Sequence, residues 1–492
     1  MAGSSGLGVE VFVDALDDAP WCPHGPTLLF ERFYQEREAR RFFACSAHRK
    51  RSGCSFFQWA DEKESSAKRA MRMEIYQASR TAEVPHSTLY SGVKAALEKP
   101  TKMASVCANC ACTVPQKKDP AHKGHTVVES LPPADLLRPT KFLPALDDSK
   151  SNAQYLFAGK AVSCILGQLH GQGIRHVVCI GAPRIHEAIT SARFSKQAPL
   201  SSMSSFLLDW DRRFASFFSP RELQHFNMFN HHFFSGDTGL ASLTKFLGKV
   251  SMSEVAVVMD PPFGGLARPL VACLEWLYAL ALEHCKDAAE STKEAPPTLN
   301  KSASSKRQLA TIWVFPYFLE SQVVETMPSM KMMDYKVDYD NHPIFTSSGK
   351  KKAEKRKSPV RLFTNINAGL LVFPAEEGYR LCKPCQKYVS AENQHCGKCH
   401  ACTTKHGPTY VHCEACKACV KPGRVHCVTC KQCLPAQHDC TGGVADSEEG
   451  SAATAMPACH RCGKTGHKRR HCPDADTQSS RPSAKRVKKS KR

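Results

Sequence analysis

Five apolar residues, Val255-Ala-Val-Val-Met259, run directly into the tetrapeptide Asp260-Pro261-Pro262-Phe263. An unbroken apolar run rich in valine predicts a buried strand of a largely parallel sheet. The two prolines fix their φ angles and have no N–H, so the turn after the strand offers carbonyl acceptors without competing donors. A carboxylate beside a proline carbonyl can accept both hydrogens of an exocyclic amine, and the phenylalanine can stack on a flat ring. The alternative is an ordinary Asp-Pro turn that closes a strand.

The sequence on both sides of this strand alternates between helix-like and strand-like runs, from residue 150 to residue 374. This alternation is typical of an α/β domain with a mostly parallel sheet. A helix is expected over residues 153–172. Strands are expected at residues 176–180, 205–208, 227–234, 255–259 and 311–315, followed by a closing pair at 331–339 and 360–364.

Two polar segments interrupt this domain. Residues 286–307 are rich in Ser, Thr, Pro, Ala and Lys, and this composition predicts disorder. Residues 350–357 carry six positive charges between the last two strands. They form either an RNA contact or a solvated hairpin loop.

The composition points to a polyanionic partner. The 492 residues include 67 Lys and Arg against 46 Asp and Glu, a formal charge of +21, which favours a nucleic acid. The first residues resemble no signal peptide, and no apolar run is long enough to span a membrane. Without a secretory signal, the 25 cysteines are better explained as zinc ligands than as disulfides.

Four cysteine-containing segments have the spacing of zinc sites. Near the N-terminus, three cysteines and a histidine can close a tetrahedral site: Cys22, His24, Cys45 and Cys54. Arginines and aromatic residues flank these ligands, so residues 15–62 resemble the GRF zinc finger, a small nucleic-acid-binding module. The aromatic residues could instead serve only as the core of the small domain.

The linker after the finger, residues 63–149, contains a second candidate site. The pattern C-x2-C-x11-H-x2-H joins Cys107, Cys110, His122 and His125 into a structural clasp over residues 107–125. Cys112 competes as a ligand.

The third segment, residues 380–440, is an internal repeat of the unit His-Cys-x2-Cys-x2-Cys. Adjacent His and Cys side chains have to diverge, so each Cys-x2-Cys pair is expected to share a zinc ion with the histidine and last cysteine of the next unit. The four expected sites are Cys382, Cys385, His395, Cys402; Cys396, Cys399, His412, Cys419; Cys413, Cys416, His426, Cys433; and Cys427, Cys430, His438, Cys440. The region is similar to the cysteine-rich part of DHHC palmitoyltransferases. It lacks the Asp-His-His-Cys tetrapeptide, so a structural zinc platform is predicted instead of acyl transfer.

The fourth segment follows a linker, residues 441–456, that is expected to be flexible. Residues 457–474 have the spacing of a CCHC zinc knuckle, a module that binds single-stranded RNA; the ligands are Cys459, Cys462, His467 and Cys472. With one site in the finger, one in the clasp, four in the repeat and one in the knuckle, the chain is expected to bind about seven zinc ions. The basic tail, residues 475–492, is expected to be disordered. It is either a nuclear or nucleolar address, an RNA contact or a merely solvated end.

The central motifs together resemble the class I, Rossmann-like methyltransferases that act on the N6 atom of adenine. The resemblance implies an α/β fold with a mostly parallel seven-stranded sheet, flanked by the zinc modules, and a catalytic role for Asp260, Pro261, Pro262 and Phe263. The segment 176–184, with Gly181 and Arg184, takes the place of the first strand and the cofactor loop, where two or three glycines are common. Asp209 takes the place of the acidic residue for the ribose, with Asp211 as the alternative. Upstream, the segment expected to close over the methionine end of the cofactor contains Gln154, Tyr155, Leu156 and Phe157.

The whole arrangement of finger, methyltransferase core, Cys/His repeat, knuckle and basic tail is similar to the zinc-finger CCHC-domain ribosomal RNA N6-adenosine methyltransferases of animals. This resemblance implies S-adenosylmethionine (SAM) as the donor, large-subunit ribosomal RNA as the substrate, and a nucleolar enzyme. It also suggests a monomer that meets ribosome-biogenesis proteins, with the cytoplasm as a further location. Two alternatives remain open at this point: a protein lysine methyltransferase, and a catalytically silent RNA-binding scaffold.

Overall fold

The structure is a computed structural model that describes residues 6–13, 16, 18–34, 38–48, 50–114, 120–146, 154–286, 299, 308–341, 358–438 and 440. The knuckle and tail expected in residues 441–492 lie outside these residues. So do most of the segment 286–307 and the lysine-rich segment 350–357. Among the described helices, none is long and apolar enough to cross a membrane.

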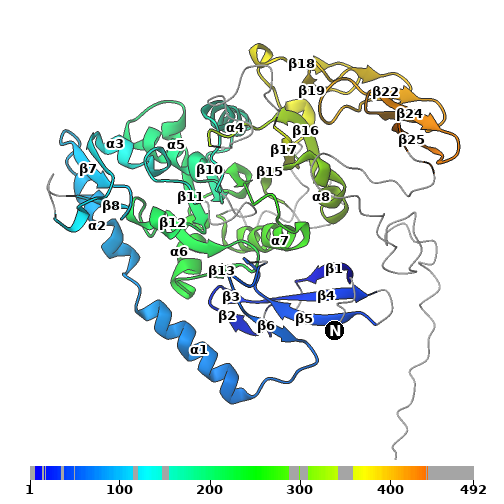
Figure 1. Cartoon of the computed structure of the whole chain (residues 1–492). Helices are drawn as coiled ribbons and strands as arrows, with labels where there is room; N and C mark the ends of the chain where they lie inside the picture. The colour runs from blue at the N-terminus through cyan, green and yellow to red at the C-terminus, as the bar shows by residue number, and fades with distance from the viewer. Residues whose placement is uncertain are drawn as a thin grey trace, which may run out of the picture.

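The centre of the molecule is an eight-stranded sheet with the order β13-β12-β11-β10-β14-β15-β17-β16 (Figure 1). Five consecutive strands of this order, from β12 to β15, are parallel, and β13, β16 and β17 pair antiparallel to their neighbours. The strands are β10 (His176–Ile180), β11 (Ser204–Asp209), β12 (Leu223–Asn227), β13 (His232–Phe233), β14 (Val255–Met259), β15 (Ala310–Pro316), β16 (Lys331–Lys336) and β17 (Val360–Thr364). The α/β class and the Rossmann-like core expected from the sequence are therefore confirmed, with one short antiparallel strand more than the seven expected.

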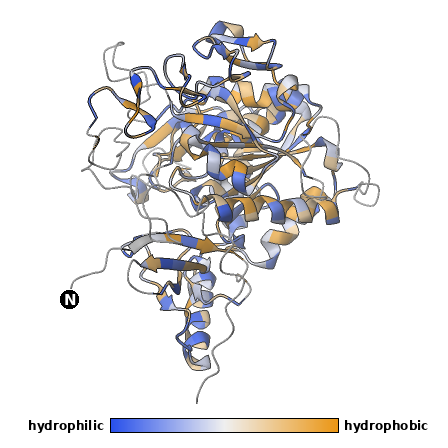
Figure 2. Cartoon of the chain, turned by 90° about the vertical axis from the view of Figure 1, so that its right-hand side faces the viewer, coloured by the Kyte–Doolittle hydropathy of each residue, from blue (hydrophilic) through white to orange (hydrophobic). Residues whose placement is uncertain are grey.

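Helices cover both faces of the sheet, because each central strand is apolar on both sides. Val177 and Cys179 of β10 point into one core with helices α4 (Gly159–Gly171) and α5 (Pro183–Phe194). Val178 and Ile180 point into the other core, with α6 (Asp237–Leu247), α7 (Ala267–His284) and α8 (Glu320–Thr326). In Figure 2 the strands between the helices are coloured as hydrophobic.

The strand expected over residues 227–234 was wrong. The structure has two short antiparallel strands there, β12 and β13, joined by a turn. Two asparagine side chains break the strand: Asn227 Oδ1 accepts the N–H of Phe229 (3.1 Å), and Asn230 Oδ1 accepts the N–H of His232 (3.2 Å). The turn carries Met228 and Phe229 to the carboxyl end of the sheet.

The helix expected over residues 153–172 starts only at Gly159. The residues before it are extended, and Phe157 forms an isolated antiparallel bridge with Tyr339. This bridge connects the segment before α4 to the segment after β16, which the sequence pattern could not show.

The N-terminal finger lies against the β12–β13 end of the sheet (Figure 1). Its strands are β1 (Gly6–Phe12), β4 (Leu28–Tyr34), β5 (Arg40–Ala44) and β6 (Phe57–Trp59) in one sheet, with the hairpin β2 (Trp21–Cys22) and β3 (Gly25–Pro26). Gly25 is needed there, because its φ is +91° and a Cβ would come within 2.5 Å of the His232 ring. The long helix α1 (Ser66–Thr81) leads away from the finger. The Tyr76 hydroxyl of this helix forms a hydrogen bond with His232 Nε2 of β13 (2.5 Å).

The two other described zinc modules lie at opposite sides of the core (Figure 1). After α2 (His86–Leu97), the clasp forms the small sheet β8-β7-β9, followed by α3 (Pro133–Leu136). The clasp strands are β7 (Ala104–Cys107), β8 (Cys112–Thr113) and β9 (Val127–Leu131).

The repeat is a row of four hairpins, β18 (Tyr379–Cys382) with β19 (Lys387–Ser390), β20 (His395–Cys396) with β21 (Ala401–Cys402), β22 (Val411–Cys413) with β23 (Ala418–Val420), and β24 (Arg424–Cys427) with β25 (Gln432–Pro435). Asp334 of β16 accepts hydrogen bonds from Ser390 N and Asn393 Nδ2, both 2.9 Å, and so holds the row on the edge of the sheet.

Candidate active site and zinc centres

A pocket opens at the carboxyl ends of the parallel strands, where ligands of open α/β sheets bind. The ends of four strands, β10, β11, β12 and β14, and the residues that follow them contribute to the pocket. The segment before α4 and the finger also contribute. The lining residues are Ala47, His48, Leu146, Gln154, Tyr155, Gly181, Pro183, Asp209, Trp210, Asp211, Phe226, Asn227, Met228, Phe229, Asp260, Pro261, Pro262 and Phe263. The tetrapeptide after β14 and the predicted ribose-binding Asp209 therefore face the same space.

Gly181 ends β10 in a backbone conformation that suits glycine. Its φ is +62°, and a Cβ at this position would lie 2.9 Å from the Asp260 carbonyl oxygen and 2.9 Å from Met228 Cε. Its N–H donates to the Leu208 carbonyl (2.9 Å). The chain then enters α5 at Pro183. A single glycine therefore makes this tight turn, where two or three glycines are common in the methyltransferases that the sequence resembles. The turn packs closely on Asp260 and Met228 and lines the pocket.

Asp209 and Asp211 have different surroundings at the end of β11. Arg213 holds Asp211 with hydrogen bonds of 2.7 and 2.9 Å, so the charge of this carboxylate is already paired. Asp209 accepts backbone hydrogen bonds from the Asp211 N–H (2.8 Å) and the Trp210 N–H, and the described residues place no arginine or lysine in an ion pair with it. Burial raises the pKa of Asp209 to about 7. Of the two, Asp209 is the carboxylate that still needs partners such as ribose hydroxyls.

Asp260 lies at the end of β14 with an aromatic cluster around it. The Tyr339 hydroxyl donates to Asp260 Oδ1 (3.0 Å). Burial raises the pKa of Asp260 well above its ordinary value, the Tyr339 hydrogen bond opposes this shift, and the nearby Asp209 charge adds to it. Phe263 stacks on Tyr155, with ring centroids 5.3 Å apart, and contacts the edge of Tyr339 at 5.8 Å.

The turn of the tetrapeptide uses the Pro262 carbonyl as an acceptor and leaves the Pro261 carbonyl available. The Gly265 N–H closes the turn by donating to the Pro262 carbonyl (2.7 Å), and the Asp260 N–H donates to the Ile180 carbonyl (3.0 Å). The Pro261 carbonyl and Asp260 Oδ2 therefore remain to accept from a planar amine. The sequence predicts these two groups as the acceptors of the amine, and this role stays a prediction.

The predicted cofactor residues of the segment 154–157 separate into two groups. Gln154 and Tyr155 line the pocket, and Gln154 Nε2 donates to Asp211 (3.4 Å). Leu156 and Phe157 are buried in the protein instead, with Phe157 packed on Tyr339 at 5.5 Å.

Arg184 likewise points away from the pocket. It donates to Thr140 Oγ1 (3.0 Å) and the Phe157 carbonyl (3.1 Å), and it pairs with Asp340. The structure gives Arg184 a role in holding segments together, and its cofactor contact stays a prediction.

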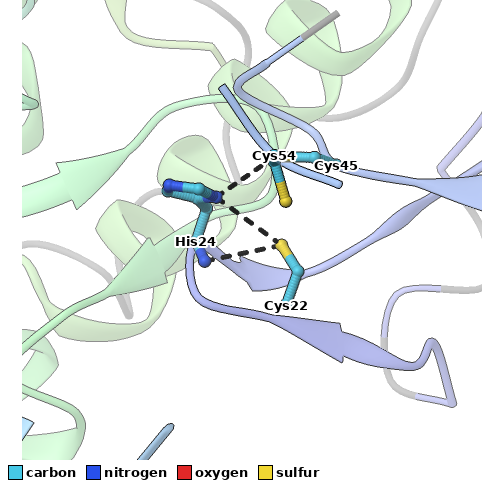
Figure 3. Close-up of side chains that lie close together, drawn as sticks. All are labelled: Cys22, His24, Cys45 and Cys54. Carbon is cyan, nitrogen blue, oxygen red and sulfur yellow. Dashed lines mark hydrogen bonds between the residues drawn. The ribbon is translucent and has the colours of Figure 1, made fainter. Parts of the chain in front are cut away.

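Six groups of cysteine and histidine side chains in the described residues could hold a metal ion. Figure 3 shows the finger group, in which Cys22, His24, Cys45 and Cys54 converge from the β2–β3 hairpin and the loop after β5. His24 Nδ1 lies 3.4 Å from Cys45 Sγ and 3.9 Å from Cys22 Sγ. The clasp brings together Cys107, Cys110, His122 and His125, the four predicted ligands. Cys112 is not part of this group.

The repeat brings its ligands together in the interleaved way that the sequence predicted. In three hairpins the histidine pairs across the hairpin with the last cysteine of the same unit: His395 with Cys402, His412 with Cys419, and His426 with Cys433. Paired residues of an antiparallel hairpin point to the same face, and the next residue along the strand points to the other. Each histidine and last cysteine therefore meet the Cys-x2-Cys pair of the preceding hairpin.

The last repeat site is assembled differently. Cys427 and Cys440 have their sulfur atoms 3.6 Å apart, and His438 offers Nε2, where the earlier sites offer Nδ1. The Cys430 N–H donates to Cys427 Sγ (3.4 Å) and lowers the pKa of that thiol to about 6, which favours the thiolate that zinc binds.

A left-handed residue follows five of the Cys-x2-Cys pairs and makes each tight turn around its metal position. These residues are Ala111, Gln386, His400, Lys417 and Lys431, with φ between 49° and 53°. None is glycine. The repeated geometry at non-glycine residues indicates a turn that the metal ligands impose.

The aromatic residues of the finger are partly capped by arginines. Arg40 lies over the Trp59 ring at 3.8 Å, and Arg72 lies over Phe56 at 4.6 Å. Phe42 is buried, whereas Trp59 and Phe57 remain partly exposed. The finger aromatics thus serve as a small core and also present a mixed arginine and aromatic surface.

Several residues in or beside the pocket carry no clear functional signal in the sequence. Tyr339 was placed on a strand without a function, and Trp210, Met228 and His48 were not considered. Their signals in the sequence are weak, since each depends on a contact between distant segments. Only Asn227 could have been noticed, as a polar residue after an apolar run at the end of a parallel strand.

Comparisons with known proteins agree with the geometry of the site. The family model described as "Probable N6-adenine methyltransferase" matches residues 148–343, and the model of the GRF zinc finger matches residues 20–63.

Full-length relatives share the arrangement. The chain is 39% identical over 490 residues to "rRNA N(6)-adenosine-methyltransferase ZCCHC4" of Homo sapiens, covering 99% of this chain and 89% of the relative. The protein of the same name from Xenopus laevis is 39% identical over 469 residues, 95% of this chain and 89% of the relative. The one from Bos taurus is 40% identical over 399 residues, 80% of this chain and 73% of the relative.

Proposed function

The chain belongs to the family of the rRNA N6-adenosine methyltransferases, and from this premise we propose that it methylates N6 of an adenosine in large-subunit ribosomal RNA. The observation that carries the proposal is the single pocket in which Asp260 and the Pro261 carbonyl face the same space as Gly181 and Asp209. An amine acceptor and a nucleoside-binding carboxylate are thereby placed together, as a methyl transfer between two nucleosides requires.

The residues present fit SAM, the cofactor of this family. Gly181 lines the pocket in a turn that packs closely on the Asp260 carbonyl, and the buried Asp209 carboxylate can accept hydrogen bonds from ribose hydroxyls. Trp210 adds an aromatic ring beside that carboxylate. When bound, SAM supplies a methyl group on a sulfonium centre.

The target adenine would be held by the tetrapeptide. The adenine has to leave its stack in the RNA to reach the pocket. Asp260 Oδ2 and the Pro261 carbonyl accept the two N6 hydrogens, which draws the nitrogen lone pair out of ring conjugation. Tyr339 keeps the carboxylate in place through Oδ1 (3.0 Å), and Phe263 offers a ring face. The rate gain would come from alignment and from removal of water around the amine.

The RNA would be recruited by the zinc modules around the core. The arginines over Trp59 and Phe56 in the finger offer positive charge and ring faces together, which suits a nucleic acid. The basic run Lys468-Arg469-Arg470 of the knuckle and the six cations of residues 485–492 extend this basic character in the sequence. The same cations support a nuclear and nucleolar location, which a fluorescent fusion with and without residues 485–492 would test.

The test of the proposed function is tritiated methyl transfer from SAM to purified large-subunit RNA, small-subunit RNA, DNA and protein fractions. We expect label in large-subunit RNA, recovered as N6-methyladenosine after digestion to nucleosides. The Asp260→Ala chain should transfer less than about a tenth of the wild-type label, a barrier increase of about 1.4 kcal/mol or more. Label in lysine residues, or in small-subunit RNA alone, would contradict the proposal.

A further inference from the structure

The finger contributes to the wall of the pocket, next to the carboxylate that suits the ribose. Ala47 and His48, which follow the zinc ligand Cys45, line the pocket beside Asp209 and Trp210. These residues belong to the loop 45–54, which begins and ends with a zinc ligand and of which the structure describes residues 45–48 and 50–54. One metal ion would therefore tie both ends of the loop.

The position of His48 depends directly on the metal site. The His48 N–H donates to Cys45 Sγ (3.4 Å), so the zinc-bound thiolate would hold the backbone of this residue. The ring packs on Gly53, where a Cβ would come within 2.5 Å of His48 Nδ1. The ring of the ligand His24 lies 4.5 Å from the His48 ring. A shift of the metal ligands would thus move His48.

Trp210 connects the metal site to the nucleoside end of the pocket. Its ring lies 5.7 Å from the His24 ring and 5.8 Å from the His48 ring, and it directly follows Asp209 in the chain. If Asp209 takes the ribose, the adenine ring of the cofactor lies beside Trp210 and within reach of the finger.

Two asparagines of the β12–β13 turn lock the finger in this position. Asn227 Nδ2 donates to the His24 carbonyl (3.1 Å) and to Ser46 Oγ (2.9 Å). Asn230 Nδ2 donates to the carbonyls of His24 (3.1 Å) and Pro26 (2.7 Å). Both asparagines are buried, with 1% and 4% of their surfaces exposed. Buried amides that bond to a zinc-ligand residue and its neighbours indicate a fixed junction.

We propose that the loop 45–54 forms the wall of the nucleoside end of the SAM pocket, with His48 as its positioning residue, so that zinc in the finger controls the affinity for the cofactor. The inference rests on the proposed function, because it takes the pocket to be the SAM site. It gives the finger a role in cofactor binding in addition to any contact with RNA.

The experiment measures zinc content and ligand affinity on the full-length chain. Calorimetry with SAM and with 5′-methylthioadenosine, which keeps the nucleoside and lacks the amino acid, separates the two ends of the pocket. Cys54→Ser removes a metal ligand without altering a pocket residue. It should lose one zinc ion and bind both ligands at least about tenfold more weakly. Cys416→Ser, in the repeat, should also lose one zinc ion but bind both ligands like the wild type.

The second variant keeps the metal. His48→Ala should retain the wild-type zinc content and weaken both ligands by a similar factor, about three- to tenfold. Lys50→Ala is the matched control in the same loop, because the Lys50 side chain is exposed and does not line the pocket. It should bind both ligands normally. His48→Ala decides the question even if Cys54→Ser fails to fold.

Two results would overturn the inference: a zinc-containing His48→Ala chain with wild-type affinity for both ligands, or a Cys54→Ser chain that has lost its zinc and binds SAM normally. A loss of affinity for SAM alone would place the contact away from the nucleoside. A wild-type chain that binds no SAM would refute the cofactor assignment, and with it this inference.

Discussion

Replacing Tyr339 with phenylalanine removes a single oxygen atom, and it tests whether the hydrogen bond from the Tyr339 hydroxyl to Asp260 supports the proposed methyl transfer. The Tyr339 hydroxyl donates to Asp260 Oδ1 at 3.0 Å, and the ring packs between Phe157 and Phe263. A phenylalanine keeps this ring packing. The substitution therefore removes the hydrogen bond and leaves the aromatic cluster.

The size of the effect follows from the charge on the acceptor. A hydrogen bond to an ionised group contributes about 1.5–3 kcal/mol. At the lower end of this range, about 1.5 kcal/mol, the rate of methyl transfer should fall about tenfold. The SAM dissociation constant should not change, because Tyr339 does not line the described pocket.

The pH dependence of the rate gives a second readout. The ionised Asp260 is the amine acceptor, so the rate should rise with pH through its pKa and then level. Burial raises this pKa and the Tyr339 hydrogen bond lowers it. Without the hydroxyl the pKa is higher, so the acid limb of the profile should move to higher pH.

The assay is single-turnover methyl transfer at saturating SAM, from pH 5 to pH 9. Tyr278→Phe is the matched control, because Tyr278 is also buried and its hydroxyl bonds to Thr311 Oγ1 (2.6 Å), in the core on the other face of the sheet. It should lose stability without a change in the pH profile. A Tyr339→Phe enzyme with the wild-type rate and the wild-type acid limb would refute the positioning role of Tyr339.

Three further outcomes follow from the site and the metal centres. Gly181→Ala should weaken SAM binding at least about tenfold, because a positive φ strains alanine by about 1–2 kcal/mol and its Cβ would lie 2.9 Å from the Asp260 carbonyl; calorimetry measures this, and normal binding would show that the turn adapts. SAM affinity should rise about tenfold between pH 6 and pH 8, since burial raises the pKa of Asp209 to about 7 and the ionised form accepts the ribose hydroxyls; the rise should be absent in Asp209→Asn. Elemental analysis should find about seven zinc ions per full-length chain, and four or fewer on fully loaded protein would exclude the interleaved repeat.

The zinc ligands show how much local spacing can determine. Each Cys-x2-Cys pair forms one turn of the backbone, so its geometry is decided within a few residues. The interleaving of the repeat also follows from neighbouring side chains, because His395 and Cys396 must point to opposite faces of a strand. The run before Asp260 likewise predicts a buried strand, because an apolar residue at every position requires a core on both faces of the sheet.

The wall of the pocket depends on contacts that no local pattern encodes. Tyr339 reaches Asp260 across 79 positions of the chain, and Asn227 reaches the His24 carbonyl across 203. The sequence also misplaced the strand at 227–234, because two side-chain hydrogen bonds to the backbone ended it where residue propensities favoured its continuation. The sequence by itself determined most of the sheet, the turn after β14 and the zinc ligand sets of the described residues, since these depend on periodicity and short spacing. Only the tertiary structure decided that the finger lies against the pocket at the carboxyl ends of the strands, because that junction is made by buried hydrogen bonds and ring contacts between surfaces that meet after folding.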